Sequence, residues 1–296
     1  MSGGTGVGMA APSIPLDIGS RDLGTGAAET AEALLPEGES LAPGAEDPFG
    51  LDAAFRRRVL PAVRFLFERY WRVDVTGARH VPPAGPALLV ANHSGALPFD
   101  GVMIVTAVEM YCGRTVRFLY DRFVENLPPV ASFYRKVGGA VATRENAVKL
   151  LDAGEVVLIF PEGVSGVAKP FADRYRLRPF GPGFARLALA TNAPIVPLAV
   201  VGAEEIYPLV GRAEGVAKRF GVPYVPITPF FPLLGVLGTL PLPTKWFMNF
   251  GKAMRIPPTE AETRWQRARL EARRMRRTIQ SMVMRLRARR RSVFFG

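Results

Sequence analysis

The sequence predicts an α/β fold, a layered domain in which a largely parallel sheet is flanked by helices. Short apolar runs alternate along the chain with stretches of helical period, which is the order of elements in layered α/β proteins. Two runs, Ala87–Ala91 and Val156–Phe160, are apolar at every position. A strand that is apolar on both faces is typical of a parallel sheet covered by helices on each side.

Seven segments have the composition of strands, and three stretches between them have a helical pattern. The expected strands are Arg72–Thr76, Ala87–Ala91, Val116–Tyr120, Ala140–Ala142, Val156–Phe160, Ile195–Val201 and Trp246–Phe250. The expected helices are Asp100–Met110, Asn146–Leu151 and Gly183–Thr191. Because these helices fall between strands, they are suited to connect parallel neighbours of one sheet.

The composition limits the class of protein. Hydrophobic residues make up 48% of the 296 positions and charged residues 22%, enough for a sizeable buried core. With Cys112 as the single cysteine and two histidines in the chain, an internal disulfide and a structural zinc site are both excluded. We expect no bound metal and no bound cofactor.

Changes in composition divide the chain into three parts. Residues 1–48 contain eight acids, one arginine and many small residues, which predicts a disordered leader. We expect a folded domain over 49–258 that begins with an amphipathic helix at 49–71, either covering the core or lying on a membrane. An Arg-rich helix is expected over 259–296.

An apolar segment at 220–244 has no charged residue in 25 positions but contains six prolines. Those prolines exclude a membrane-spanning helix, because each removes a backbone donor. We expect an apolar, Pro-rich loop that either packs on the core or dips into lipid.

Positive charge is concentrated near the C-terminus. The formal net charge is +12, and residues 264–291 contain twelve arginines with Glu271 as the single acid. Such a segment attracts nucleic acid or an anionic membrane surface. The arginines are not interleaved with aromatics suited to base stacking, which favours the membrane over nucleic acid.

His93 is the stronger of the two candidates for histidine chemistry. It follows the buried strand Ala87–Ala91, and Asp100 would lie in the first turn of the next helix, at the crevice where open α/β sheets bind ligands. A carboxylate bonded to one ring nitrogen leaves the other nitrogen to accept a proton from a hydroxyl. A structural histidine beside a capping aspartate gives the same pattern, so both interpretations stay open here. His80, in a polar turn before two prolines, is typical of a surface residue.

Two further turns bring charged residues to strand ends. The strand Val156–Phe160 runs into Glu162, Gly163 and Val164, and a Gly-rich strand leads to Arg144 at the start of a helix. A solvated position at the helix start is the alternative for Arg144.

Taken together, these blocks resemble the glycerolipid (lysophospholipid) acyltransferase superfamily over about 72–256. The blocks are Asn92-His93 with Asp100, Gly139 with Arg144, Phe160-Pro161-Glu162-Gly163, and Ala193-Pro194-Ile195-Val196-Pro197. The Pro-rich segment followed by Lys245-Trp246 is similar to the branch that contains monoacylglycerol and diacylglycerol acyltransferases.

The resemblance implies an O-acyltransferase that moves a fatty acyl group from acyl-CoA or acyl carrier protein to a lipid hydroxyl. It implies a peripheral protein on the cytoplasmic side of a membrane, with His93 as the general base and Asp100 orienting it. The implied substrate-binding residues are Asn92, Ser94, Gly95, Arg144, Glu162, Gly163 and Val164. A non-catalytic, basic membrane-binding protein with an acyltransferase-like core is the alternative class.

Two departures from the family pattern bear on the chemistry. Six residues separate His93 from Asp100, where the family commonly has four. Members that use phosphorylated acceptors usually continue Glu-Gly-Thr-Arg, whereas Val164 and Ser165 stand here. Loss of that arginine removes a bidentate phosphate partner, so we expect a neutral, glyceride-like acceptor. A 1-acylglycerol-3-phosphate-type enzyme, with Lys169 or Arg144 holding the phosphate, is the alternative.

Overall fold

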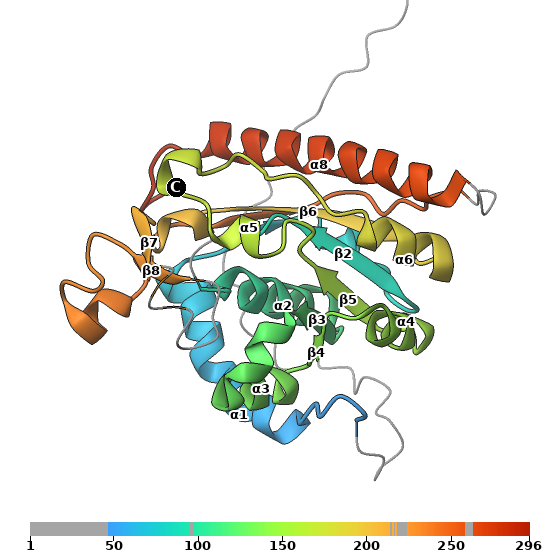
Figure 1. Ribbon diagram of the computed structural model, residues 1–296, viewed down its shortest axis with the longest axis horizontal. Helices are drawn as coiled ribbons and strands as arrows, with labels where there is room; N and C mark the ends of the chain where they lie inside the picture. Colours follow the sequence, from blue (N-terminus) through green and yellow to red (C-terminus); the bar gives the residue numbers. More distant parts are fainter. Residues whose placement is uncertain (1–46, 95–96, 214, 216, 218–223, 258–262) are drawn as a thin grey trace, which may run out of the picture. The chain divides into compact units, whose positions relative to one another are not determined.

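The computed structural model describes residues 47–94, 97–213, 215, 217, 224–257 and 263–296 (Figure 1). All but the last two residues of the predicted leader lie outside the described residues. Among the described residues, none of the helices combines the length and the apolar character needed to cross a bilayer.

A seven-stranded sheet forms the centre of the domain, with the order β1-β9-β6-β2-β5-β3-β4 (Figure 1). Its strands are β1 (Asp74–Thr76), β2 (Ala87–Ala91), β3 (Val116–Tyr120), β4 (Gly139–Val141), β5 (Val156–Ile159), β6 (Ile195–Val201) and β9 (Phe247–Phe250). All neighbours are parallel except β6 and β9. The predicted α/β fold with a largely parallel sheet is confirmed. Six of the seven predicted strand segments contain one of these strands, and the segment Ala140–Ala142 overlaps β4, which begins one residue earlier.

A second, two-stranded sheet was not predicted. It pairs β7 (Gly211–Ala213) antiparallel with β8 (Val225–Ile227). β8 lies within the segment expected to be a loop, and Pro226 is accommodated there because a strand with one partner has a free edge.

Helices connect the strands and cover both faces of the sheet (Figure 1). They are α1 (Ala53–Phe65), α2 (Phe99–Cys112), α3 (Pro128–Lys136), α4 (Arg144–Asp152), α5 (Val164–Val167), α6 (Gly183–Thr191) and α8 (Arg264–Arg289). Shorter turns are η1 (Leu66–Tyr70), η2 (Ala78–His80), η3 (Arg122–Asn126), η4 (Phe171–Asp173), η5 (Ala203–Glu205) and η6 (Gly235–Thr239). The three helices predicted between strands correspond to α2, α4 and α6, whereas α3 and α5 were not predicted.

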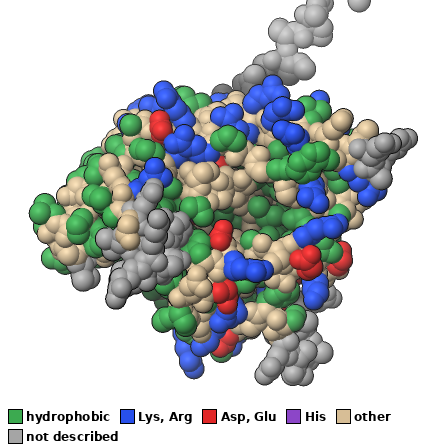
Figure 2. Space-filling model, in the orientation of Figure 1, with side chains coloured by type: hydrophobic (Ala, Val, Ile, Leu, Met, Phe, Trp, Pro, Cys, Tyr) green, Lys and Arg blue, Asp and Glu red, His purple; other side chains and the backbone are tan. Residues whose placement is uncertain are grey.

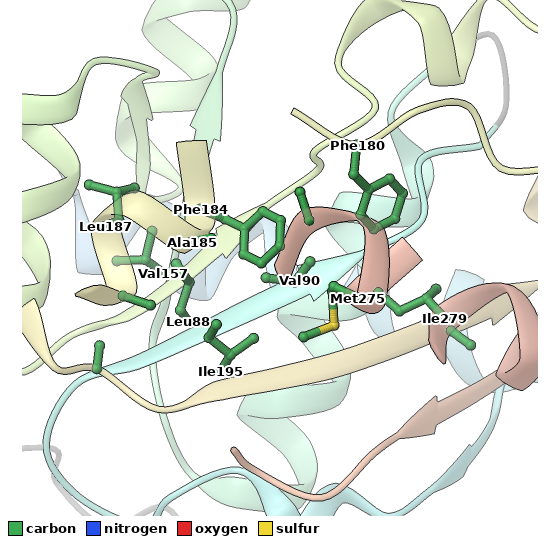
Figure 3. Packing of buried hydrophobic residues seen from close by; sticks show 14 of the residues in the cluster. Leu88, Val90, Val157, Phe180, Phe184, Ala185, Leu187, Ile195, Met275 and Ile279 are labelled. Carbon is green, nitrogen blue, oxygen red and sulfur yellow. The ribbon is translucent and has the colours of Figure 1, made fainter. Parts of the chain in front are cut away.

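Alternate residues of the central strands enter two separate cores, because successive side chains of a strand point to opposite faces. Leu88 and Val90 pack with residues of α4, α6 and α8 (Figure 3). Leu89 packs on the other face with residues of α2 and with the stacked pair Trp71 and Trp246, whose ring centroids are 4.9 Å apart.

The basic helix α8 belongs to the first of these cores. Its apolar positions recur every three or four residues and are buried: Ala268, Ala272, Met275, Ile279, Met282, Val283 and Leu286. Its arginines lie mostly on the opposite face, where Lys and Arg side chains gather at the top of Figure 2. Periodicity therefore lets one helix serve as a core element and as a basic surface.

Candidate active site

The first site residues stand at the carboxyl end of β2. The Asn92 side chain is buried and makes two bonds to one residue of the neighbouring strand β6, donating from Nδ2 to the Val200 carbonyl (3.0 Å) and accepting from the Val200 N–H (2.8 Å). Asn92 therefore fixes the start of the loop that carries His93, and its amide is occupied by protein backbone.

His93 and Asp100 form a hydrogen-bonded pair. His93 Nδ1 lies 2.7 Å from Asp100 Oδ2, and Asp100, the second residue of α2, is fully buried. The same carboxylate accepts the backbone N–H groups of Ser94 and Gly101, each at 2.8 Å. The two side chains thus meet although six residues separate them in the sequence.

This pairing determines what the imidazole can do. With a carboxylate accepting at Nδ1, the neutral ring carries its proton there and presents a lone pair at Nε2. Nε2 has no hydrogen-bond partner within the described part of the chain, and the His93 side chain is 14% exposed. The Phe160 ring, just after β5, stacks on the imidazole at 4.0 Å between centroids and 16° between planes. His93 is therefore oriented by two neighbours, and Nε2 remains free to take a proton.

Glu162 ties His93 to a second loop. Its buried carboxylate accepts the His93 backbone N–H at Oε1 (3.0 Å) and the Arg178 backbone N–H at Oε2 (2.7 Å). Gly166 lies against both residues, because a Cβ there would come within 2.8 Å of Glu162 Cβ and 2.9 Å of His93 Cβ. Sequence reasoning missed Gly166, whose only signal was a small residue in a Gly-rich turn.

Lys169 completes a buried cluster beside Glu162. Its Nζ lies 2.8 Å from Glu204 Oε1 and 3.5 Å from Glu162 Oε2. Burial raises the pKa of Glu204, while the Lys169 ammonium acts in the opposite direction. Lys169 is thus committed to two carboxylates and is not placed as the phosphate partner that the sequence offered. The partner Glu204 was missed, since it follows β6, 35 residues further along the chain.

This chain is similar to known proteins in sequence and in fold. A family model described as Acyltransferase matches residues 72–201. The chain is 45% identical to an uncharacterized protein of Mycobacterium leprae over 257 residues, which cover 84% of this chain and 70% of that protein. An uncharacterized protein of Mycobacterium tuberculosis is 44% identical over the same length, covering 84% and 72%.

The chain belongs to the acyltransferase family. This acyltransferase is also 26% identical over 163 residues to the human "DGAT1/2-independent enzyme synthesizing storage lipids", covering 54% of this chain and half (50%) of that protein. The fold is similar to that of the 1-acyl-sn-glycerophosphate (LPA) acyltransferase PlsC from Thermotoga maritima, with a TM-score of 0.52 at 18% identity and with 80% and 83% of the chains covered. The resemblance to the glycerolipid acyltransferases, and within them to the diacylglycerol acyltransferase-like branch, is confirmed, and with it the enzyme class.

Other residues that the resemblance implied lie in different surroundings. Arg144 begins α4 after β4, and two strands, β3 and β5, separate β4 from β2, a lateral distance of roughly 14 Å. Its exposed guanidinium has no hydrogen bond or ion pair with any residue that the structure describes.

Val164 is half-buried at the start of α5, Gly163 precedes it at φ +55°, and Gly95 lies outside the described residues. Ser94 is fully buried, and its Oγ has no partner among the described residues.

Two adjoining hollows lie on the far side of Gly166 in this acyltransferase. The first is lined by residues of α5 and η4 and by Lys169, Pro170, Arg174, Glu204, Tyr207 and Leu209. The second shares Pro170 and Leu209 with it and extends to Gly211 and Arg212 of β7. Gly166 lines the first hollow and packs against His93, and the second hollow reaches the small sheet at Gly211 and Arg212.

Proposed function

We propose that this acyltransferase transfers a fatty acyl group from acyl-CoA or acyl carrier protein to the hydroxyl of a neutral, glyceride-like lipid. The observation that carries the proposal is the His93–Asp100 pair with its free Nε2. A non-catalytic core would have no need of an imidazole whose tautomer is fixed from one side and whose other nitrogen is left open.

The reaction follows from that geometry. The acceptor hydroxyl gives its proton to His93 Nε2 as its oxygen attacks the thioester carbonyl carbon. The tetrahedral intermediate then breaks its C–S bond, and the proton on Nε2 passes to the leaving thiolate. The products are an ester and a thiol. Asp100 stabilises the imidazolium between the two steps.

The charges near His93 favour a neutral acceptor. Lys169 is buried between Glu162 and Glu204, Arg144 is about three strand spacings away, and Val164-Ser165 replace the Thr-Arg of phosphate-binding relatives. One observation favours the alternative, a 1-acylglycerol-3-phosphate acceptor. Arg174, which stacks on Phe171 at 4.3 Å, lines the first hollow.

We place the enzyme peripherally on the cytoplasmic side of a membrane. Two surfaces support this. One is the basic outer face of α8, which suits anionic headgroups. The other is an apolar lobe, residues 224–244, whose Leu233 and Leu237 are 82% and 70% exposed. Hydrophobic side chains are visible at the left of Figure 2, near β7 and β8 in Figure 1.

A donor and acceptor screen read by mass spectrometry tests the proposal. We expect His93→Ala to lower acyl transfer by about 10²–10⁴-fold, with Asp100→Asn impaired by loss of the correct tautomer. His80→Ala, which alters the other histidine, is the matched control and keeps the parent rate. Transfer by His93→Ala at the parent rate would refute the mechanism. In competition, preference for lysophosphatidate over monoacylglycerol would select the alternative acceptor.

A further inference from the structure

A buried chain of charges connects Lys169 to the catalytic histidine. The side chains of Glu162, Lys169 and Glu204 are 0%, 3% and 7% exposed. The Lys169 ammonium is within ion-pair distance of both carboxylates. A buried carboxylate is strongly unfavourable without a partner, so Lys169 neutralises two groups that the fold has removed from water.

The atom of Glu162 nearest Lys169 also determines how that side chain is oriented. Oε2 accepts the Arg178 N–H and faces Nζ, while Oε1 accepts the His93 N–H. Without the Lys169 ammonium, Oε2 would keep the Arg178 N–H as its single partner among the described residues, so the carboxylate would be held less firmly and its bond to the His93 backbone would weaken. The position of the His93 main chain thus depends on a cation that does not touch the imidazole.

The segment Tyr175–Arg178 is fixed from its other side by α8. Arg276 donates to the Leu177 carbonyl at 2.8 Å, and Gln280 accepts the Leu177 N–H at 2.9 Å while donating to the Tyr175 carbonyl at 2.7 Å. Glu204 accepts the Tyr175 N–H. Glu162 is therefore held between an anchored segment and Lys169, with few ways to move.

We propose that Lys169 is a positioning residue of this acyltransferase, which holds Glu162 and thereby fixes the His93 main chain so that Nε2 meets the acceptor hydroxyl. The inference rests on the proposed general-base role of His93. This positioning role differs from charge balance alone. Lys169 neutralises two carboxylates, but Glu162 accepts the His93 N–H, whereas Glu204 accepts the Tyr175 N–H.

That difference gives the test. Lys169→Met leaves two buried carboxylates without a cation, so it lowers stability and rate together. Adding Glu204→Gln restores the net charge of the cluster but not the partner of Glu162. We expect the double variant to recover the Tm of Glu204→Gln, yet to show kcat lowered by about 10- to 100-fold, the effect of a misplacement near 1 Å. Because Lys169 and Glu204 both line the first hollow, Glu204→Gln alone is the control for changes in KM, and the added Lys169→Met should lower kcat more than it changes KM. Lys149→Met, the same substitution at an exposed site in α4, is the matched control.

A second pair of variants tests the same role of Lys169 in case the double variant does not fold. Lys169→Arg keeps a cation and Lys169→Gln does not, so kcat should be higher in the arginine variant. Recovery of both Tm and kcat in the double variant, or equal kcat in the arginine and glutamine variants, would overturn the proposal. His93→Ala is measured beside them on the same substrates. If it stays active, the general-base mechanism fails; if it is inactive while the double variant keeps the parent kcat, only the role of Lys169 fails.

Discussion

The most basic helix of the chain and its longest uncharged segment behave in opposite ways. α8 places Met275, Ile279 and Met282 in the core at 4% exposure or less. The apolar lobe has no charged residue, yet it exposes Leu233 and Leu237 to solvent. Average composition would have assigned the first to the surface and the second to the interior.

Spacing explains the reversal. The apolar residues of α8 recur at intervals of three and four, so they form one continuous stripe that packs on β6 and α6, and the arginines point away from it. In the lobe, Pro229 and Pro232 interrupt regular hydrogen bonding, so apolar side chains do not line up on one face. The lobe is held instead by a few polar contacts to its carbonyls, from Tyr70 to Pro241 and from Trp71 to Leu242.

The largest expected effect is on stability. Ile279→Ala removes buried atoms from the α8 stripe, and we expect it to lower the free energy of unfolding by about 2–5 kcal/mol. Leu237→Ala in the lobe should stay within about 0.5 kcal/mol of the parent, since the side chain is largely in solvent. Urea unfolding followed by circular dichroism measures both. Equal losses would mean that the lobe packs on the domain as α8 does.

Sequence reasoning succeeded where the signal was local. The strand β2 was predicted because five consecutive residues are apolar. The His93–Asp100 pair was predicted because His93 lies in the turn after that strand and Asp100 lies at the start of the next helix. The Arg-rich helix expected over 259–296 overlaps α8, but its composition gave no measure of how deeply its apolar residues are buried.

It failed where charges from distant segments meet. Lys169 was offered as a phosphate partner in place of the arginine that phosphate-binding relatives carry, yet it pairs with Glu204. Glu162 was assigned to the acceptor pocket, and both of its oxygens accept backbone N–H groups. Pairings of this kind depend on the sheet order, which brings the ends of β2, β5 and β6 together and which single-sequence patterns do not specify.

The next effect concerns membrane binding. Its dependence on salt should distinguish the apolar lobe from the basic face of α8. Leu233→Ser/Leu237→Ser should weaken binding to vesicles of phosphatidylcholine and phosphatidylglycerol by about tenfold or more at any salt, because apolar burial is not screened. Arg273→Gln/Arg277→Gln, on the exposed face of α8, should weaken it by about fivefold at low salt. At 0.5 M salt that difference should vanish.

Co-sedimentation of each variant at low and high salt provides the measurement. Neutral vesicles are the control, since they should bind the parent and the α8 variant equally. A lobe variant that binds as the parent does would remove the lobe from the membrane surface. An α8 variant whose loss persists at high salt would show that its arginines act through something other than headgroup charge.

The smallest effect is a pH dependence that contrasts buried with exposed charge. Burial, opposed by Lys169, raises the pKa of Glu204 above its ordinary value of 4.5. A carboxyl whose folded pKa is raised contributes its full stability below the unfolded pKa, and this contribution is lost as pH rises through the folded pKa. The glutamine of Glu204→Gln does not titrate, so the Tm of this variant should rise by a few degrees relative to that of the parent as pH rises from about 4.5 toward neutrality.

Arg277→Gln, which alters a solvated charge, should show a constant difference in Tm over the same range. Scanning calorimetry of the three proteins at several pH values measures this, and a Glu204→Gln difference as flat as that of Arg277→Gln would mean that burial does not perturb this carboxyl.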